Sequence, residues 1–276
     1  MALSILNNIP SLMAENQLSI TQQGLQKTLF QLSSGSRINS GADDAAGLAI
    51  ADVLSANITS LQQSAANAND GVGALQVADG ALAQVTTLLN RAVTLATESA
   101  TGTVSSDQRT AINAEFTAIK AEIDRIGSQT SFNGTSVFTA STTSIFLSDA
   151  NSNSTIAVNV GVLSSSSIGP STTNLSGDDL TTSDSATTAL ADINSAIASV
   201  AASRGNLGAG MNRLASAVNV MQNQVQNLTA AVDTIKSADI GTSVANLSKY
   251  QILQQTGISA LAQANSSQQS VLKLLQ

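Results

Sequence analysis

The chain has 276 residues, a net charge of −7, and neither cysteine nor histidine. The missing residue types exclude disulfides, thiolate nucleophiles, serine–histidine triads and histidine-ligated zinc, and the negative charge argues against nucleic acid. Only 2% of the residues are aromatic and 11% are charged, which favours slender helices over a globular aromatic core. We therefore expect a structural protein with no catalytic residue, cofactor or metal.

Residues 3–33 carry apolar side chains at helical spacing. The opposite face holds Asn, Gln, Ser and Thr, whereas a helix that lies on a membrane surface needs Lys and Arg there. The pattern favours a helix that packs on other helices. Its apolar positions are Leu6, Ile9, Met13, Leu18, Leu25, Leu29 and Leu32.

A connector follows this first helix, bracketed by Gly35 and Gly41. Ser40, Asp43 and Asp44 come just before the next apolar pattern. Their oxygens can accept hydrogen bonds from the free N–H groups of a helix start, and the carboxylates complement its dipole. Capping is the preferred interpretation over a metal site.

Two long stretches repeat apolar residues alternately three and four positions apart. The first runs from Leu54 to Ala96, interrupted by Asp79 and Thr86; the second runs from Leu190 to Ile235, interrupted by Arg204. A 3.5-residue repeat is typical of coiled-coil helices. The two stretches predict a mainly α fold: a long antiparallel helical rod or coiled-coil bundle.

Glycines inside the first stretch resemble a nucleotide-binding loop only superficially. Gly71-Val72-Gly73 has no strand before it, so the motif lacks the structural context that it requires. We expect these glycines to permit close approach of two helices.

A third helix is predicted after Ser105, which forms a capping box with Gln108 and is followed by an apolar seam that ends before Gly127. Gly127 fits the residue that follows a helix. Beyond it, residues 145–147 and 156–162 predict two strands joined by a turn over 149–153. The Ser/Thr-rich remainder up to Thr188 is expected to be exposed.

The helical pattern changes phase after Ile235. A weaker seam begins at Ile240 and continues to the end of the chain, so the shift near Asp239 predicts a boundary between two packing layers. The N-terminus has no basic residue before Lys27, and no uncharged apolar run is long enough to cross a bilayer, so neither a secretory signal nor membrane insertion is expected. The seam residues are Ile240, Val244, Leu247, Ile258, Leu261, Leu272 and Leu275.

These residues together resemble the bacterial flagellins. The resemblance covers roughly residues 1–140 and 186–276, and its motifs occur in order at both ends of the chain. They are Leu32-Ser33-Ser34-Gly35, Arg37-Ile38-Asn39-Ser40, Asp43-Asp44-Ala45-Ala46-Gly47, Ala49-Ile50-Ala51 and Asn67-Ala68-Asn69-Asp70-Gly71 near the N-terminus. Near the C-terminus they are Gln251-Ile252-Leu253-Gln254-Gln255-Thr256-Gly257, Leu261-Ala262-Gln263-Ala264-Asn265, Val271-Leu272 and Leu274-Leu275.

The resemblance implies a subunit that polymerises into the extracellular flagellar filament. It also implies export through the flagellar type III apparatus with an export chaperone, and contact with hook-associated and cap proteins. A hook–filament junction protein and a secreted coiled-coil adhesin are the alternatives. The implied segments are an inner-layer helix over 1–40, an outer-layer rod over 41–140, a short β-rich variable insert over 141–188, the returning outer-layer rod over 189–237 and an inner-layer helix over 238–276.

Family members are also detected by an animal innate receptor, through the region that corresponds to Asn90–Ala100 and the next helix. Arg91, Leu95 and Glu115 match that pattern, but Ala92-Val93-Thr94 stand where it has an arginine and then a glutamate. Each missing charge-assisted hydrogen bond is worth about 1.5–3 kcal/mol, so we expect poor receptor activation.

Overall fold

The computed structural model describes residues 8–147, 154–168 and 174–274. In these ranges the chain is mainly helical, as predicted, with two small antiparallel sheets. The elements are α1 (Ile9–Ser34), α2 (Ala45–Ala100), α3 (Ser106–Gln129), β1 (Ser131–Phe132), β2 (Thr135–Ser136), β3 (Thr143–Phe146), β4 (Thr155–Val158), a 3-10 turn η1 (Leu175–Gly177), α4 (Ser183–Lys236) and α5 (Ile240–Leu274).

The chain divides into two compact units. Unit 1 contains residues 1–56 and 227–276, and therefore holds α1, α5 and the adjoining ends of α2 and α4. Unit 2 contains residues 57–226, and holds the rest of α2 and α4 together with α3 and the strands. The two units differ sharply in how they bury apolar residues.

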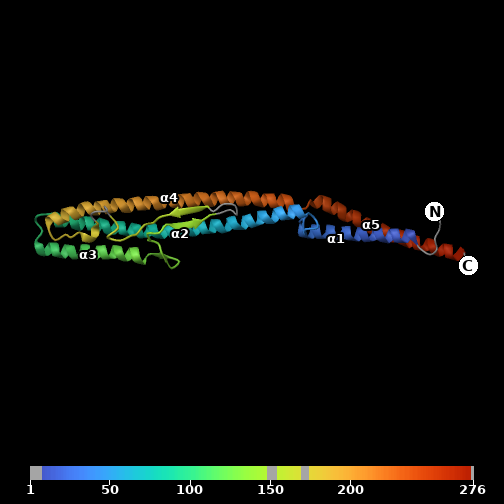
Figure 1. The fold of residues 1–276 in the computed structure, drawn as a ribbon, viewed down its shortest axis with the longest axis horizontal. Helices are drawn as coiled ribbons and strands as arrows, with labels where there is room; N and C mark the ends of the chain where they lie inside the picture. Colours follow the sequence, from blue (N-terminus) through green and yellow to red (C-terminus); the bar gives the residue numbers. More distant parts are fainter. Residues whose placement is uncertain (1–7, 148–153, 169–173, 275–276) are drawn as a thin grey trace. The chain divides into compact units, whose positions relative to one another are not determined.

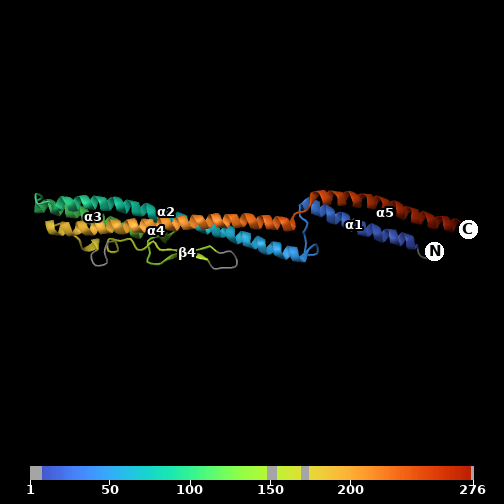
Figure 2. The same ribbon diagram turned by 90° about the horizontal axis from the view of Figure 1, so that it is seen from above.

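The core of unit 2 lies where α2 and α4 run antiparallel, side by side in both views (Figures 1 and 2). Leu75 of α2 lies close to Gly210 of α4, and Gly71 lies close to Leu214. The predicted seams are confirmed over part of their length, where their large apolar residues are buried, whereas others, such as Leu54, Leu190 and Val225, are half-buried. On α2 the buried residues are Leu61, Leu75, Leu82 and Leu89, and on α4 they are Ile193, Val200, Leu207, Leu214, Val218 and Met221.

Two of the polar residues that interrupt the seams, Asp79 of α2 and Arg204 of α4, bind each other. Arg204 donates two hydrogen bonds to Asp79, from Nε to Oδ1 at 2.7 Å and from Nη2 to Oδ2 at 3.2 Å. These bonds lower the pKa of Asp79. Since the pair joins residues 125 positions apart, it favours one register of α4 along α2, which the sequence pattern did not reveal.

Helix α3 covers a second side of α2. Its capping box is confirmed, because Ser105 and Gln108 exchange side chain–backbone hydrogen bonds, and its predicted seam is buried at Phe116, Ile119 and Ile123. The prediction for Gly127 is wrong, since α3 continues to Gln129. A Cβ on Gly127 would overlap the carbonyl oxygen of Leu163, so glycine is required there by close packing.

The insert is more ordered than its composition indicates. Strands β3 and β4 pair antiparallel with Ile145 opposite Ile156, which confirms the predicted hairpin; its turn over 149–153 lies outside the described residues. The expectation of a wholly exposed segment is wrong, because Leu163, Ile168, Leu175 and Leu180 are buried. Gly71 accordingly gives room to the Ile145 side chain of β3 as well as to α4.

Polar side chains of α3 fasten the insert to the bundle. Asp124 accepts hydrogen bonds from the backbone N–H and the hydroxyl of Ser165, at 2.6 and 3.0 Å. Lys120 Nζ donates to the Asp178 carbonyl at 2.6 Å, and the N–H of Leu180 donates to Asn113 Oδ1 at 2.9 Å. These bonds hold a Ser/Thr-rich chain without regular structure against α3.

One helix of the described residues, α2, is long and apolar enough to cross a membrane, by length and composition only. Its large apolar side chains, such as Leu82 and Leu89, are buried within unit 2. A single helix of this length and composition is by itself weak evidence of a membrane span.

Candidate assembly interface

Unit 1 is built around an antiparallel pair formed by α1 and α5, which lie side by side in both views (Figures 1 and 2). At one end of the pair, Asn8 Nδ2 and Ser11 Oγ donate to Asn265 Oδ1 at 3.4 and 3.1 Å. Further along, the Tyr250 ring lies over Gly24, where a Cβ would approach ring carbon atoms to 2.6 Å. The two ends of the chain are thus joined through small and polar residues.

Small and hydroxyl-bearing side chains also form the contact between these ends. Among the described residues, Thr21, Thr28 and Ser243 are the buried polar residues of the pair, and Gly257 faces Leu18. The two threonine hydroxyls donate to carbonyls of their own helix, at 2.8 Å each. Among the described residues of α1 and α5, no large apolar side chain is completely buried by this contact, so it uses only part of the hydrophobic stabilisation that these side chains could give.

The large apolar side chains of the pair are exposed. On α1 these are Ile9, Leu12, Met13, Ile20, Leu29 and Phe30, with exposures between 46% and 70%, and on α5 they are Ile240, Val244, Ile252, Leu253 and Ile258, with exposures between 38% and 64%.

Unit 1 therefore lacks an apolar core of its own. Among the described residues, its buried hydrophobic side chains are only Ile38 and Ala51. Ile50 and Val53, at the start of α2, add to the exposed set. Contiguous exposed apolar surface of this kind marks an interaction site.

The predicted seam residues fall into three groups. Leu18, Leu25, Leu32, Leu247 and Leu261 are half-buried, whereas Ile9, Met13, Leu29, Ile240, Val244 and Ile258 are exposed. Leu6 and Leu275 lie outside the described residues, as does the side chain of Leu272. The prediction missed Leu12, Ile20, Phe30, Ile252 and Leu253, because it followed one stripe per helix while these residues lie beside that stripe.

The capping predicted at the start of α2 is confirmed for Asp44 and is wrong for Ser40 and Asp43, which bond within the connector. Asp44 accepts a hydrogen bond from the Gly47 N–H at 2.9 Å and so caps α2. Asp43 instead accepts from the backbone N–H groups of Asn39 and Ser40, at 3.2 and 3.1 Å, and pairs with Lys27 at 2.8 Å. The connector is thereby fixed to both helices that it joins.

The same connector contacts the junction between α4 and α5. Gly35 ends α1 in the left-handed conformation, with φ 66°, and its carbonyl accepts a hydrogen bond from Ala238 at 3.0 Å. The N–H of Arg37 donates to the Lys236 carbonyl at 2.6 Å. The phase shift predicted near Asp239 corresponds to this break, where Asp239 accepts a hydrogen bond from the Thr242 N–H.

Acid should loosen the connector only at low pH. The Lys27 ammonium, with the backbone N–H groups, lowers the pKa of Asp43 from 3.8 to about 2. A carboxyl group whose pKa is lower in the folded state stabilises the fold at any pH above its pKa in the unfolded state. This contribution is lost as the pH falls through its pKa in the folded state. We expect NMR titration to find the Asp43 carboxyl near pH 2 and higher in Lys27→Gln; an ordinary value in the unaltered protein would contradict this account.

The three residues matched to an innate-receptor pattern lie in unit 2. Arg91 donates two hydrogen bonds to Glu115, at 2.7 and 3.1 Å, and both side chains are about half exposed. Leu95 is 2% exposed, so a partner that docks on unit 2 as folded could contact the ion pair but hardly the leucine. Weak activation by the monomer stays a prediction; in a cell reporter assay, a response equal to that of a strongly activating relative would overturn it.

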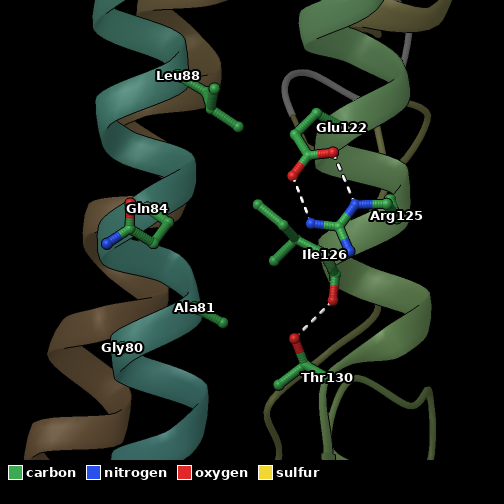
Figure 3. Close-up of a pocket in the computed structure, with 8 residues that line it drawn as sticks. All are labelled: Gly80, Ala81, Gln84, Leu88, Glu122, Arg125, Ile126 and Thr130. Atoms are coloured by element: carbon green, nitrogen blue, oxygen red, sulfur yellow. Dashed lines mark hydrogen bonds and ion pairs between the residues drawn. The ribbon is translucent and has the colours of Figure 1, made fainter.

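A groove of about 390 Å³ separates α2 from α3 (Figure 3). An ion pair within one turn of α3, between Arg125 and Glu122 at 2.6 Å, borders it opposite Gln84 and Leu88. Nothing in its lining resembles a nucleophile with a base, and no group of three or more potential metal ligands occurs among the described residues. Its lining is Gly80, Ala81, Gln84, Leu88, Glu122, Arg125, Ile126 and Thr130.

Comparison with known proteins gives consistent matches at both ends. The N-terminal helical region of bacterial flagellin matches residues 5–143, and the C-terminal helical region matches residues 190–275. The flagellin of Halalkalibacterium halodurans is 34% identical over 98% of both chains, and that of Bacillus subtilis is 32% identical over 98% of both. The flagellar filament 30.7 kDa core protein of Treponema maltophilum is 34% identical over 98% of both. A crystal structure of Bacillus cereus flagellin matches 60% of this chain and 94% of that one with TM-score 0.49 and 28% identity.

Proposed function

The chain belongs to the bacterial flagellin family and is a subunit of the flagellar filament, and on this premise we propose that the exposed faces of α1 and α5 join its subunits. It is a structural protein and not an enzyme. The relatives that match it over almost their whole length are named flagellin or flagellar filament core protein. We therefore prefer the filament subunit over a hook–filament junction protein or an adhesin.

The observation that carries this proposal is the contrast between the two units. Unit 2 buries its leucines between its own helices, whereas unit 1 leaves side chains such as Phe30 and Ile252 more than 60% exposed. Covering an aliphatic or aromatic side chain of this size contributes about 1.5–3 kcal/mol. Eleven such residues on one helix pair supply a strong drive for association with further copies.

We propose the following layers for the filament. Residues 1–40 and 238–276 form the inner layer, where their apolar faces are covered by neighbouring subunits. Residues 41–140 and 189–237 form the outer layer, which supports the short insert over 141–188. The support for this division is that α1 and α5 lack a core, while α2, α3 and α4 share one.

The partners of the unassembled chain follow from the same surface. A subunit with this much exposed apolar surface needs protection before it polymerises. We propose that an export chaperone covers this surface, that the flagellar export apparatus passes the chain outward, and that hook-associated and cap proteins contact it at the two ends of the filament.

Polymerisation from purified monomer tests the proposed role of the terminal faces. Seeded protein should form long helical filaments visible by electron microscopy, and a variant that lacks residues 240–276 should remain monomeric while unit 2 stays folded. Filaments formed by the truncated variant would show that the terminal pair is not the joining surface.

Amide exchange should differ between the two units of the monomer. The contact between α1 and α5 buries few apolar side chains, so it compensates poorly for the conformational entropy of two ordered helices. We expect faster exchange in α1 and α5 than in residues 61–96 of α2, and strong protection of both after polymerisation. Equal protection in the monomer would contradict this expectation.

A further inference from the structure

The α1·α5 pair carries very few charged side chains. Between Ile9 and Ser270 they are Glu15 and Lys27 on α1 and Lys249 on α5. Lys27 pairs with Asp43 of the connector. Glu15 and Lys249 are both exposed and have opposite charges; within the described ranges neither makes an ion pair.

These two charges are too far apart to pair within one chain. Gly257 lies beside Leu18 and Tyr250 lies beside Gly24, so in this antiparallel register Glu15 is level with about residue 260. Lys249 is then displaced by roughly ten residues, or about 15 Å at 1.5 Å per residue.

The two charges also point to opposite sides of the pair. Glu15 lies seven residues, or about two helical turns, after Asn8, so the two side chains lie on the same side of α1. On that side Asn8 hydrogen-bonds to Asn265 of α5. Lys249 precedes Asn265 by about four and a half turns of 3.6 residues. This half-turn difference places Lys249 on the side of α5 away from Asn265.

Each charge lies within the apolar surface that assembly must cover. Leu12, one turn before Glu15, is 60% exposed, and Ile252, one turn after Lys249, is 64% exposed. When these residues are buried against a second copy, the adjacent charge also loses water. A charge that loses water without a partner is costly, whereas an oppositely charged group restores much of that loss.

We propose that Glu15 of one copy forms an ion pair with Lys249 of the next copy in the filament. Because the two charges lie on opposite sides of one pair, the contact is head-to-tail and repeats along a stack of identical copies, as a filament requires. The apolar faces supply the attraction, and the ion pair selects the order and register of stacking. This inference rests on the proposed joining of subunits through α1 and α5.

Charge exchange tests the pairing. The single variants Glu15→Lys and Lys249→Glu each place like charges at the contact, so each should raise the critical concentration for polymerisation about tenfold or more at low salt. The double variant should polymerise like the unaltered protein. An equimolar mixture of the two single variants should also polymerise, because every contact between unlike copies again joins opposite charges.

The mixture separates pairing from a general effect on folding. Glu and Lys are both good helix formers, and circular dichroism should give the same unfolding profile for all variants. The proposed ion pair is overturned if the single variants polymerise like the unaltered protein. It is also overturned if the mixture polymerises no better than either single variant alone. If the unaltered protein itself fails to polymerise, the role of the terminal pair in assembly is overturned with it.

Discussion

Leu261→Asp is expected to give a folded monomer that does not polymerise. Leu261 is half-buried on the side of α5 that faces α1, between Gly257, which lies against Leu18, and Ala264, whose carbonyl accepts a hydrogen bond from Asn8. A carboxylate there has no cationic partner among the described residues. Its desolvation on assembly costs about 3 kcal/mol or more, which raises the critical concentration more than roughly a hundredfold at about 1.4 kcal/mol per tenfold.

Sedimentation and electron microscopy measure this outcome, with Leu261→Met as the matched control. Methionine keeps the size and apolar character of leucine, so the control should polymerise. The unfolding of unit 2 should be the same in both variants, because its core contains neither α1 nor α5. Normal filaments from the aspartate variant would show that this side of α5 stays accessible to water in the assembly.

Gly127→Ala is expected to destabilise unit 2 by about 2 kcal/mol or more, although alanine favours a helix by about 1 kcal/mol relative to glycine. The added methyl group would overlap the carbonyl oxygen of Leu163, and a backbone atom cannot rotate away as a side chain can. Moving that carbonyl also disturbs the bonds between Ser165 and Asp124 two residues later.

Gly205→Ala is the control for this substitution. Gly205 is an exposed position inside α4, and a Cβ there would meet no atom within 4 Å. Thermal unfolding should therefore show a rise of about 1 kcal/mol in stability for Gly205→Ala and a loss for Gly127→Ala. A gain at both positions would mean that the segment around Leu163 adjusts at little cost.

Much of the fold follows from local patterns in the sequence. The 3.5-residue repeats locate α2 and α4, the Ser105–Gln108 capping box locates the start of α3, and alternation locates the β3–β4 hairpin. The break before Ile240 is likewise visible as a change of phase. These features are readable because each depends on residues within a few turns of one another.

Contacts between segments that are distant in the chain could not be predicted from these local patterns. The pairing of Asp79 with Arg204 and the approach of Leu163 to Gly127 depend on segments far apart in the chain. Two residues that interrupt separate seams do not reveal that they face each other. Leu175 and Leu180 are likewise buried although the insert around them is polar. Lys120 and Asn113 of α3 hydrogen-bond to the backbone of this segment.

The terminal helices α1 and α5 separate most clearly what the sequence determined from what the tertiary structure determined. Sequence alone determined that both ends are helical and apolar on one stripe, and the motifs at those ends indicated the family. Only the tertiary structure decided which side chains meet: Thr21, Thr28 and Ser243 lie between the helices, while Met13, Phe30 and Ile252 face outward. Close pairing of α1 with α5 selects small residues, and the large apolar residues beside them are left to contact other copies of the chain.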